Sequence, residues 1–132
     1  MTNNNSVALI FSLDEKEKFK AMDFDGACHE KVLRILKVIR NLEATLQLLT
    51  SFLLKTALFT EIDKRSIQND WKFYRLRERL WDVMGKLESD LRHKWMPHYF
   101  IAGVDLLYGI PLASISKMRD RLSRIRGCES VV

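Results

Sequence analysis

Residues 32–49 read VLRILKVIRNLEATLQLL, and this stretch decides the fold class. Apolar residues recur at spacings of three and four through residues 32–42, which is the period of a helix with one buried face. The leucine-rich run that follows is apolar over more than half of a helical circumference, so it predicts a central helix over residues 44–62. No alternation typical of a strand exceeds four residues. The sequence therefore predicts an all-α protein.

Capping residues predict two helix starts in the first third of the chain. Ser12 and Glu15 match a capping box, in which both side chains bond free backbone N–H groups, and they predict a short helix over residues 13–21. Asp25 is expected to cap the helix that contains residues 32–42. These two helices flank the leucine-rich one.

The second half of the chain predicts three more helices. Asp70 is expected to cap a long helix that ends near Trp95, because Pro97 disfavours helical geometry before it. Two short helices are expected over residues 98–108 and 112–126. The expected architecture is a compact helical bundle of five to six helices with a basic amphipathic C-terminal helix.

The composition is that of one globular domain. The chain has 132 residues, 47% of them hydrophobic, with only 5 Gly and 2 Pro, which excludes collagen-like, mucin-like and disulfide-scaffold proteins. We expect a single helical domain over residues 1–132, with a flexible or loosely packed N-terminus at 1–11, a bundle core at 12–95 and a C-terminal helical pair at 98–126.

The chain carries no targeting signal that we recognise. Its two cysteines, Cys28 and Cys128, are typical of a reducing compartment. The apolar run over residues 7–11 is too short for a signal peptide, and the run over residues 99–112 is shorter than the roughly 20 residues that span a bilayer. We therefore expect a nuclear or cytoplasmic protein without a membrane partner.

The net charge of +5 comes from the C-terminal end. Residues 1–90 hold 15 Lys and Arg against 14 Asp and Glu, whereas residues 91–132 hold 7 against 3. Three interpretations stay open for the last helix: docking on the bundle with its arginines in solvent, binding of nucleic acid, or lying on a membrane surface. The residues that would bind nucleic acid are Lys117, Arg119, Arg121, Arg124 and Arg126.

No group of residues in the sequence indicates a catalytic or metal-binding site. His93 and His98 do not lie at zinc-ligand spacing from a cysteine or carboxylate. His29 adjoins Cys28 and Glu30, but adjacent residues on a helix point in different directions. There is no Gly-rich phosphate loop and no nucleophile or metalloprotease motif. We predict that the protein is not an enzyme and has no catalytic residue, no cofactor and no metal.

Residues 32–49 resemble the second and third helices of the N-terminal domain of the TFIIS transcription elongation factor, and residues 77–87 resemble its last helix. The related integrase-binding domain of the lens-epithelium-derived growth factor family has an Asp five residues before a Cys, as Asp23 precedes Cys28 here. The resemblance implies a right-handed helical bundle in a transcription or chromatin complex, with a docking edge made of two loops.

At this edge, an Asp would accept hydrogen bonds from the partner backbone and large side chains would receive an apolar residue. The resemblance assigns these roles to Asp23, Phe24, Asp25, Ile67 and Trp71. Helix capping is an alternative role for both aspartates.

Together these observations predict a non-enzymatic protein–protein interaction module that docks short disordered motifs. One alternative is a self-associating helical adaptor that forms a homodimer. It is favoured by the more than one apolar face of the leucine-rich helix and by Trp71, Trp81 and Trp95 on the long helix that follows. The other is nucleic-acid binding through the Arg-rich C-terminal helix.

Overall fold

The computed structural model describes residues 16–17, 20, 26–65 and 67–127, and in this part of the chain the prediction of an all-α fold is confirmed. Four α-helices form it: α2 (His29–Leu42), α3 (Ser51–Lys64), α4 (Leu76–His93) and α5 (Leu112–Gly127). Three short 3₁₀ helices connect them: η1 (Ala44–Leu46), η2 (Gln68–Trp71) and η3 (Phe73–Arg75). The described residues contain two isolated β-bridges but no strand. The helix expected over residues 13–21 falls mostly outside them.

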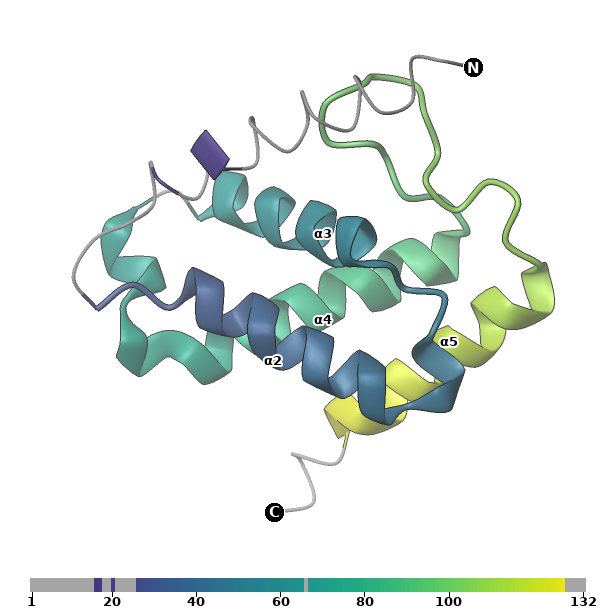
Figure 1. The fold of residues 1–132 in the computed structure, drawn as a ribbon, viewed down its shortest axis with the longest axis horizontal. Coiled ribbons are helices and arrows are strands. Elements are labelled where there is room, and N and C mark those ends of the chain that lie inside the picture. Colours follow the sequence, from purple (N-terminus) through teal and green to yellow (C-terminus); the bar gives the residue numbers. More distant parts are fainter. Residues whose placement is uncertain (1–15, 18–19, 21–25, 66, 128–132) are drawn as a thin grey trace.

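Helix α4 is the centre of the described fold. It contacts α2, α3 and α5, and Figure 1 shows it between α3 and α2 with α5 at its side. The sequence predicts the leucine-rich helix as the central one. That helix is indeed buried around most of its circumference, but it contacts only α2 and α4 among the other α-helices through more than a few residues. The largest fully buried side chains belong to α3, α4, α5 and the segments between the helices, and α2 adds the buried Val32, Leu33 and Leu36.

The break between α2 and α3 is made by side chains that bond free backbone groups. The Gln47 amide donates to the carbonyls of Arg40 and Glu43, and the Arg40 guanidinium donates to the carbonyl of Leu49. The Thr50 hydroxyl then accepts the N–H of Leu53 and caps α3. The helix predicted over residues 44–62 therefore begins at Ser51, because these bonds favour a 3₁₀ turn and a cap over a continuous helix.

A tertiary contact also delays the start of α4. The N–H of Cys28 donates to the carbonyl of Trp71 at 2.8 Å, and Ala27 and Lys72 form an isolated bridge. Lys72 is extended, with ψ of 153°, which interrupts the helical geometry between η2 and η3. The long helix predicted from Asp70 to Trp95 thus runs only from Leu76 to His93, and Lys94 ends it with a positive φ of 57°.

The prediction of a helix over residues 98–108 is wrong, because this segment is a loop between α4 and α5. Asp105 Oδ1 accepts the N–H groups of Met96 at 2.9 Å and Leu107 at 3.0 Å. His98 Nδ1 accepts those of Phe100 and Ile101. Side chains thus take the backbone donors that a helix would use. Gly103, with φ of 81°, also leaves helical geometry.

Asp105→Ala is expected to lower the free energy of unfolding by about 2 kcal/mol, because two partly buried N–H groups lose a charged acceptor. Urea unfolding followed by circular dichroism measures this difference. Asp105→Asn is the matched control, since its amide oxygen can accept the same two bonds. Equal losses in both variants would contradict the capping role and point to the charge alone.

Acid is expected to loosen the loop at His98. Burial lowers the pKa of this imidazole, and its Nδ1 accepts two N–H groups only while it is unprotonated. The folded-state pKa lies below the unfolded one, so the stabilisation is fully present above the ordinary His pKa and is lost as the pH falls through the lowered value.

Hydrogen exchange of the Phe100 and Ile101 amides, compared at about pH 7.5 and about pH 5 after correction for intrinsic rates, tests this expectation. His98→Asn keeps an acceptor that does not titrate, so its corrected protection should be independent of pH. Wild-type protection that does not fall in acid would show that the imidazole bonds do not hold the loop.

Helix α5 is docked on the bundle. Ile115, Met118 and Leu122 are buried on its inner face, and its main neighbour is α4. Its C-terminal end is held by Arg126, whose carbonyl accepts the Trp81 indole N–H at 3.2 Å and whose guanidinium bonds Glu88 at 2.6 Å. Of the three interpretations of this helix, docking on the bundle thus describes its position. No helix in the described residues is long and apolar enough to cross a membrane.

Candidate interaction surface

The predicted docking edge is only partly within the described structure. Asp23, Phe24 and Asp25 lie outside the described residues. Ile67 is 68% exposed, but Trp71 is fully buried and offers no surface to a partner in this conformation. Of the two loops of this edge, the structure describes residues 67–71, where Ile67 precedes η2.

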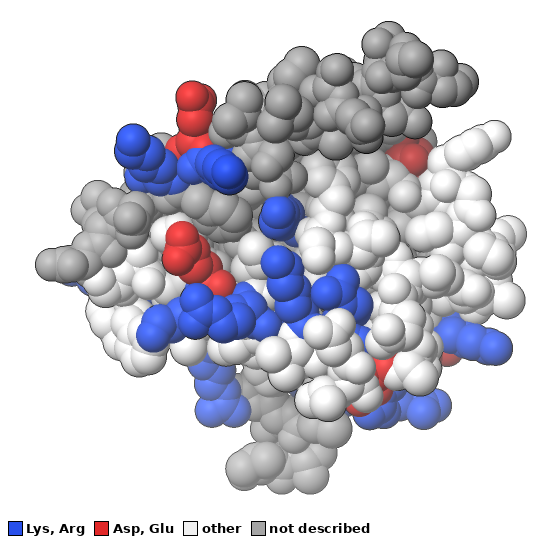
Figure 2. Space-filling model, in the orientation of Figure 1, with Lys and Arg blue, Asp and Glu red and all other residues white. Residues whose placement is uncertain are grey.

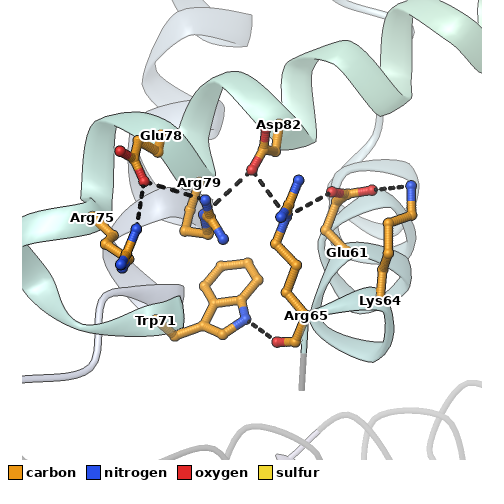
Figure 3. Close-up of polar contacts among 8 residues, drawn as sticks. All are labelled: Glu61, Lys64, Arg65, Trp71, Arg75, Glu78, Arg79 and Asp82. Atoms are coloured by element: carbon orange, nitrogen blue, oxygen red, sulfur yellow. Dashed lines mark hydrogen bonds and ion pairs between the residues drawn. The ribbon is translucent and has the colours of Figure 1, made fainter. Parts of the chain in front are cut away.

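Trp71 is instead the centre of a polar cluster at the α3–α4 junction (Figure 3). Its indole N–H donates to the carbonyl of Arg65 at 2.6 Å. Above the ring, Arg65 and Arg79 both approach Asp82 Oδ2, at 3.1 and 3.3 Å. Glu61 and Glu78 extend the chain of charges on either side. The cluster joins the end of α3, η2 and the first turns of α4.

The charged side chains of this cluster are partly buried and also line two surface hollows. Glu78, Arg79 and Asp82 line one of about 480 Å³, and Glu61, Arg65 and Asp82 line one of about 390 Å³. The side chains of Glu61 and Arg79 are 4% and 7% exposed, and each has an oppositely charged partner. A buried charge needs such a partner because removing it from water is costly. Among the described residues, no three His, Cys, Asp or Glu side chains are grouped so that they could hold a metal ion.

The five basic residues predicted to bind nucleic acid divide into two groups in the structure. Arg121 pairs with Glu43, Arg126 with Glu88 and Arg119 with Asp120. Lys117 and Arg124 are exposed, and neither has an ion pair within the described part of the chain. Only two of the five therefore present a cation that is not already paired.

These two residues line a groove between η1 and α5. Its first part, of about 350 Å³, lies between Ala44, Thr45, Gln47 and Leu48 on one side and Ser114 and Lys117 on the other. Its second part, of about 230 Å³, shares Thr45 and Lys117 and continues between Asp120, Arg121 and Arg124. Leu48 is 46% exposed. The groove thus offers an apolar contact at one end and cations along the α5 wall.

The ion pair between Glu43 and Arg121 connects the two sides of this region. The hydrogen bond from Arg121 lowers the pKa of the Glu43 carboxyl, with a smaller opposing effect of desolvation. The second bond of the pair, from Arg121 Nη2 to Glu43 Oε2, measures 3.0 Å. Glu43 therefore stays ionised at neutral pH and neutralises Arg121, which leaves Lys117 and Arg124 as the cations available to a ligand.

A second basic surface was not expected from the sequence. Figure 2 shows a band of Lys and Arg side chains over α2. The helix holds Lys31, Arg34, Lys37 and Arg40 against Glu30. The linear charge count hides this band, because many acidic residues of the first 90 belong to other segments, such as the buried Glu61 and Glu88. The spacing of three between the four cations is the signal that could have revealed it.

The sequence model of a protein family, described as the Mab-21 protein HhH/H2TH-like domain, matches residues 28–124. This match overturns the resemblance to the TFIIS N-terminal domain and to the integrase-binding domain of the lens-epithelium-derived growth factor family. That resemblance rested on leucines at helical spacing, which unrelated helical bundles share because each must bury one face of every helix. The docking edge and the transcription setting that it implied lose their basis.

Proposed function

This chain belongs to the Mab-21 HhH/H2TH-like domain family, and from this premise we propose that it is a non-enzymatic module that binds a short acidic segment of a protein partner. The binding site is the groove between η1 and α5. The observation that carries the proposal is the pair of unpaired cations, Lys117 and Arg124, on the wall of a groove that also exposes Leu48. This site replaces the docking edge expected from the sequence.

The lining of the groove fits a segment that combines carboxylates with an apolar side chain. Lys117 contributes to both parts of the groove, and Arg124 to the second, so a carboxylate-bearing segment would follow the α5 wall. Ala44 and Leu48 would receive its apolar residue. Because η1 and α5 are fixed by the Glu43–Arg121 pair, the site needs little reorganisation on binding.

Reversing both groove charges, Lys117→Glu with Arg124→Glu, is expected to weaken peptide binding at least about tenfold. The probe is a short fluorescein-labelled peptide of Glu-Glu-Leu repeats, and fluorescence anisotropy measures its dissociation constant. Lys72→Glu with Lys94→Glu changes the net charge equally at exposed positions outside the groove, so it is the matched control. Leu48→Ala should weaken binding too, because its exposed side chain contributes the apolar contact.

Equal losses in the two double variants would overturn the site and leave only a general attraction between a basic protein and an acidic peptide. An unchanged dissociation constant in Lys117→Glu with Arg124→Glu would overturn the groove itself. Circular dichroism of each variant confirms that the fold is retained, which is expected because all the changed side chains are exposed.

The basic band on α2 favours nucleic-acid binding as a second candidate function. Of the cations on α2, Arg34 is exposed and Lys37 is half-buried. If they contact phosphates, Arg34→Ala with Lys37→Ala should lower the slope of log K against log salt concentration for a labelled RNA. The expected decrease is that of about two lost phosphate contacts. Deleting α5 would not test nucleic-acid binding alone, because this helix is part of the core.

A further inference from the structure

The loop between α4 and α5, residues 94–111, exposes more large apolar side chains than its length explains. Tyr108 is 90% exposed, Trp95 47% and Ile101 42%, and Leu112 at the start of α5 is 63% exposed. Scattered exposed hydrophobic residues are ordinary, but a group of them on one segment marks an interaction surface. This surface lies outside the η1–α5 groove, whose lining contains none of the four.

The loop holds few charges. Lys94 lies at its start, and from Trp95 to Ser116 the only charged residue is Asp105, whose Oδ1 accepts the N–H groups of Met96 and Leu107. Figure 2 shows the side of the molecule that holds this loop mostly in white, in contrast to the basic band over α2. A protein of net charge +5 therefore has one neutral, apolar region.

The loop is held in one shape before any partner arrives. Pro97 and Asp105 form an isolated bridge, and the N–H of Leu106 donates to the carbonyl of Met96 at 2.7 Å. On its inner side, the Tyr99 ring packs on Phe59 with centroids 5.2 Å apart, and its hydroxyl bonds Asp63. A fixed loop loses little conformational entropy on association. More of the free energy gained by burying its exposed side chains therefore remains as binding free energy.

The exposed area is that of a small interface. A Trp or Tyr side chain carries roughly 150–250 Å². The exposed parts of the four large apolar side chains thus amount to on the order of 500 Å² per partner, which is at the lower end for a specific interface. Aromatic residues such as Trp95 and Tyr108 are also the type that contributes most to binding energy.

We propose that this loop surface is the contact between two copies of this chain. In a two-fold symmetric dimer each surface meets itself, so a charged patch would repel its own copy. The neutral loop is free of this repulsion, whereas the basic α2 band and the groove are not. The proposed contact shares no residue with the lining of the η1–α5 groove.

Analytical ultracentrifugation of the full chain over a wide concentration range tests the dimer. We expect wild-type protein to pass from monomer to dimer, and Tyr108→Arg to raise the dissociation constant at least about tenfold, because it buries a charged side chain in an apolar contact. Ile101→Arg should act in the same direction. Tyr74→Arg is the matched control, because Tyr74 is 69% exposed on η3 and outside the loop.

A monomer at every concentration would overturn the proposal, as would a dimer that Tyr108→Arg and Tyr74→Arg weaken equally. Sedimentation with vesicles of phosphatidylcholine and phosphatidylserine tests whether a lipid surface, rather than a second copy, contacts the loop. If monomeric wild-type protein sediments with them and Tyr108→Arg does not, the loop contacts lipid and the dimer is wrong. Because all three substituted side chains are exposed, circular dichroism should show an unchanged fold.

Discussion

Trp71→Ala is expected to lower the free energy of unfolding by about 4 kcal/mol, the largest effect of any single substitution considered for this chain. The indole is fully buried, and its removal leaves a cavity between the end of α3, η2 and the start of α4. It also leaves the Arg65 carbonyl without its 2.6 Å donor, below the Arg79 and Asp82 pair. Chemical denaturation followed by far-ultraviolet circular dichroism measures the difference.

Two further variants separate the sources of this loss. Trp71→Phe keeps most of the buried ring but loses the N–H, so it should cost about 1–2 kcal/mol. Phe73→Ala is the matched control at a neighbouring position, where the ring is 52% exposed, and its effect should stay within about 1 kcal/mol. A similar small effect of Trp71→Ala would mean that the indole is not the buried anchor that the structure shows.

Met118→Ala is expected to cost about 3 kcal/mol, because this side chain is fully buried between α5 and the rest of the core. The same denaturation experiment measures it, and hydrogen exchange along α5 shows whether the helix detaches on its own. Lys117→Ala, one residue earlier on the exposed face, should change stability by no more than about 0.5 kcal/mol.

The two outcomes of the Met118 experiment have different meanings. A large, cooperative loss shows that α5 belongs to the core, as its buried face indicates. Retained global stability with fast exchange confined to α5 would show a helix that separates from the bundle, and the groove between η1 and α5 would then lose one wall.

The C-terminal end of α5 approaches α4 closely at a glycine, which the sequence does not reveal. Gly85 on α4 lies under the Arg126 guanidinium, and a Cβ there would approach Arg126 Nη2 to 2.9 Å. The glycine thus makes room for the arginine that reaches Glu88. From the sequence, Arg126 is one of five similar cations on a basic helix, and Gly85 is an unexplained glycine in a helical pattern.

Helix positions were predictable to different degrees along the chain. The predicted helix over residues 112–126 matches α5 within one residue at its end, because Pro111 and the apolar spacing of Ile115, Met118 and Leu122 are local signals. The segment at 98–108 carries similar apolar content, yet it is a loop. Its N–H groups are bonded by Asp105 and His98, and no periodicity records that competition.

The candidate site was less predictable than the fold. Lys117 and Arg124 were singled out from the sequence as part of a basic helix, but the groove also needs Leu48 and Thr45 from a turn about 70 residues earlier. Ion pairing determines which other cations are available to a ligand. Arg121 and Arg126 are bonded to Glu43 and Glu88, which lie 78 and 38 residues away in sequence. No linear charge count separates paired from unpaired cations.

The sequence by itself determined that this protein is all-α and which face of most helices is buried, because the spacing of apolar residues is a property of neighbouring positions along the chain. Only the tertiary structure decided that α4 begins at Leu76, that residues 98–108 form a neutral loop and that two cations of α5 stay unpaired. The start of α4 depends on the bond between Cys28 and Trp71, and the division into paired and unpaired cations depends on pairs such as Glu43 with Arg121. Such bonds form only when the folded chain brings distant segments together. The loop depends instead on two side chains within it, Asp105 and His98, which bond its backbone N–H groups.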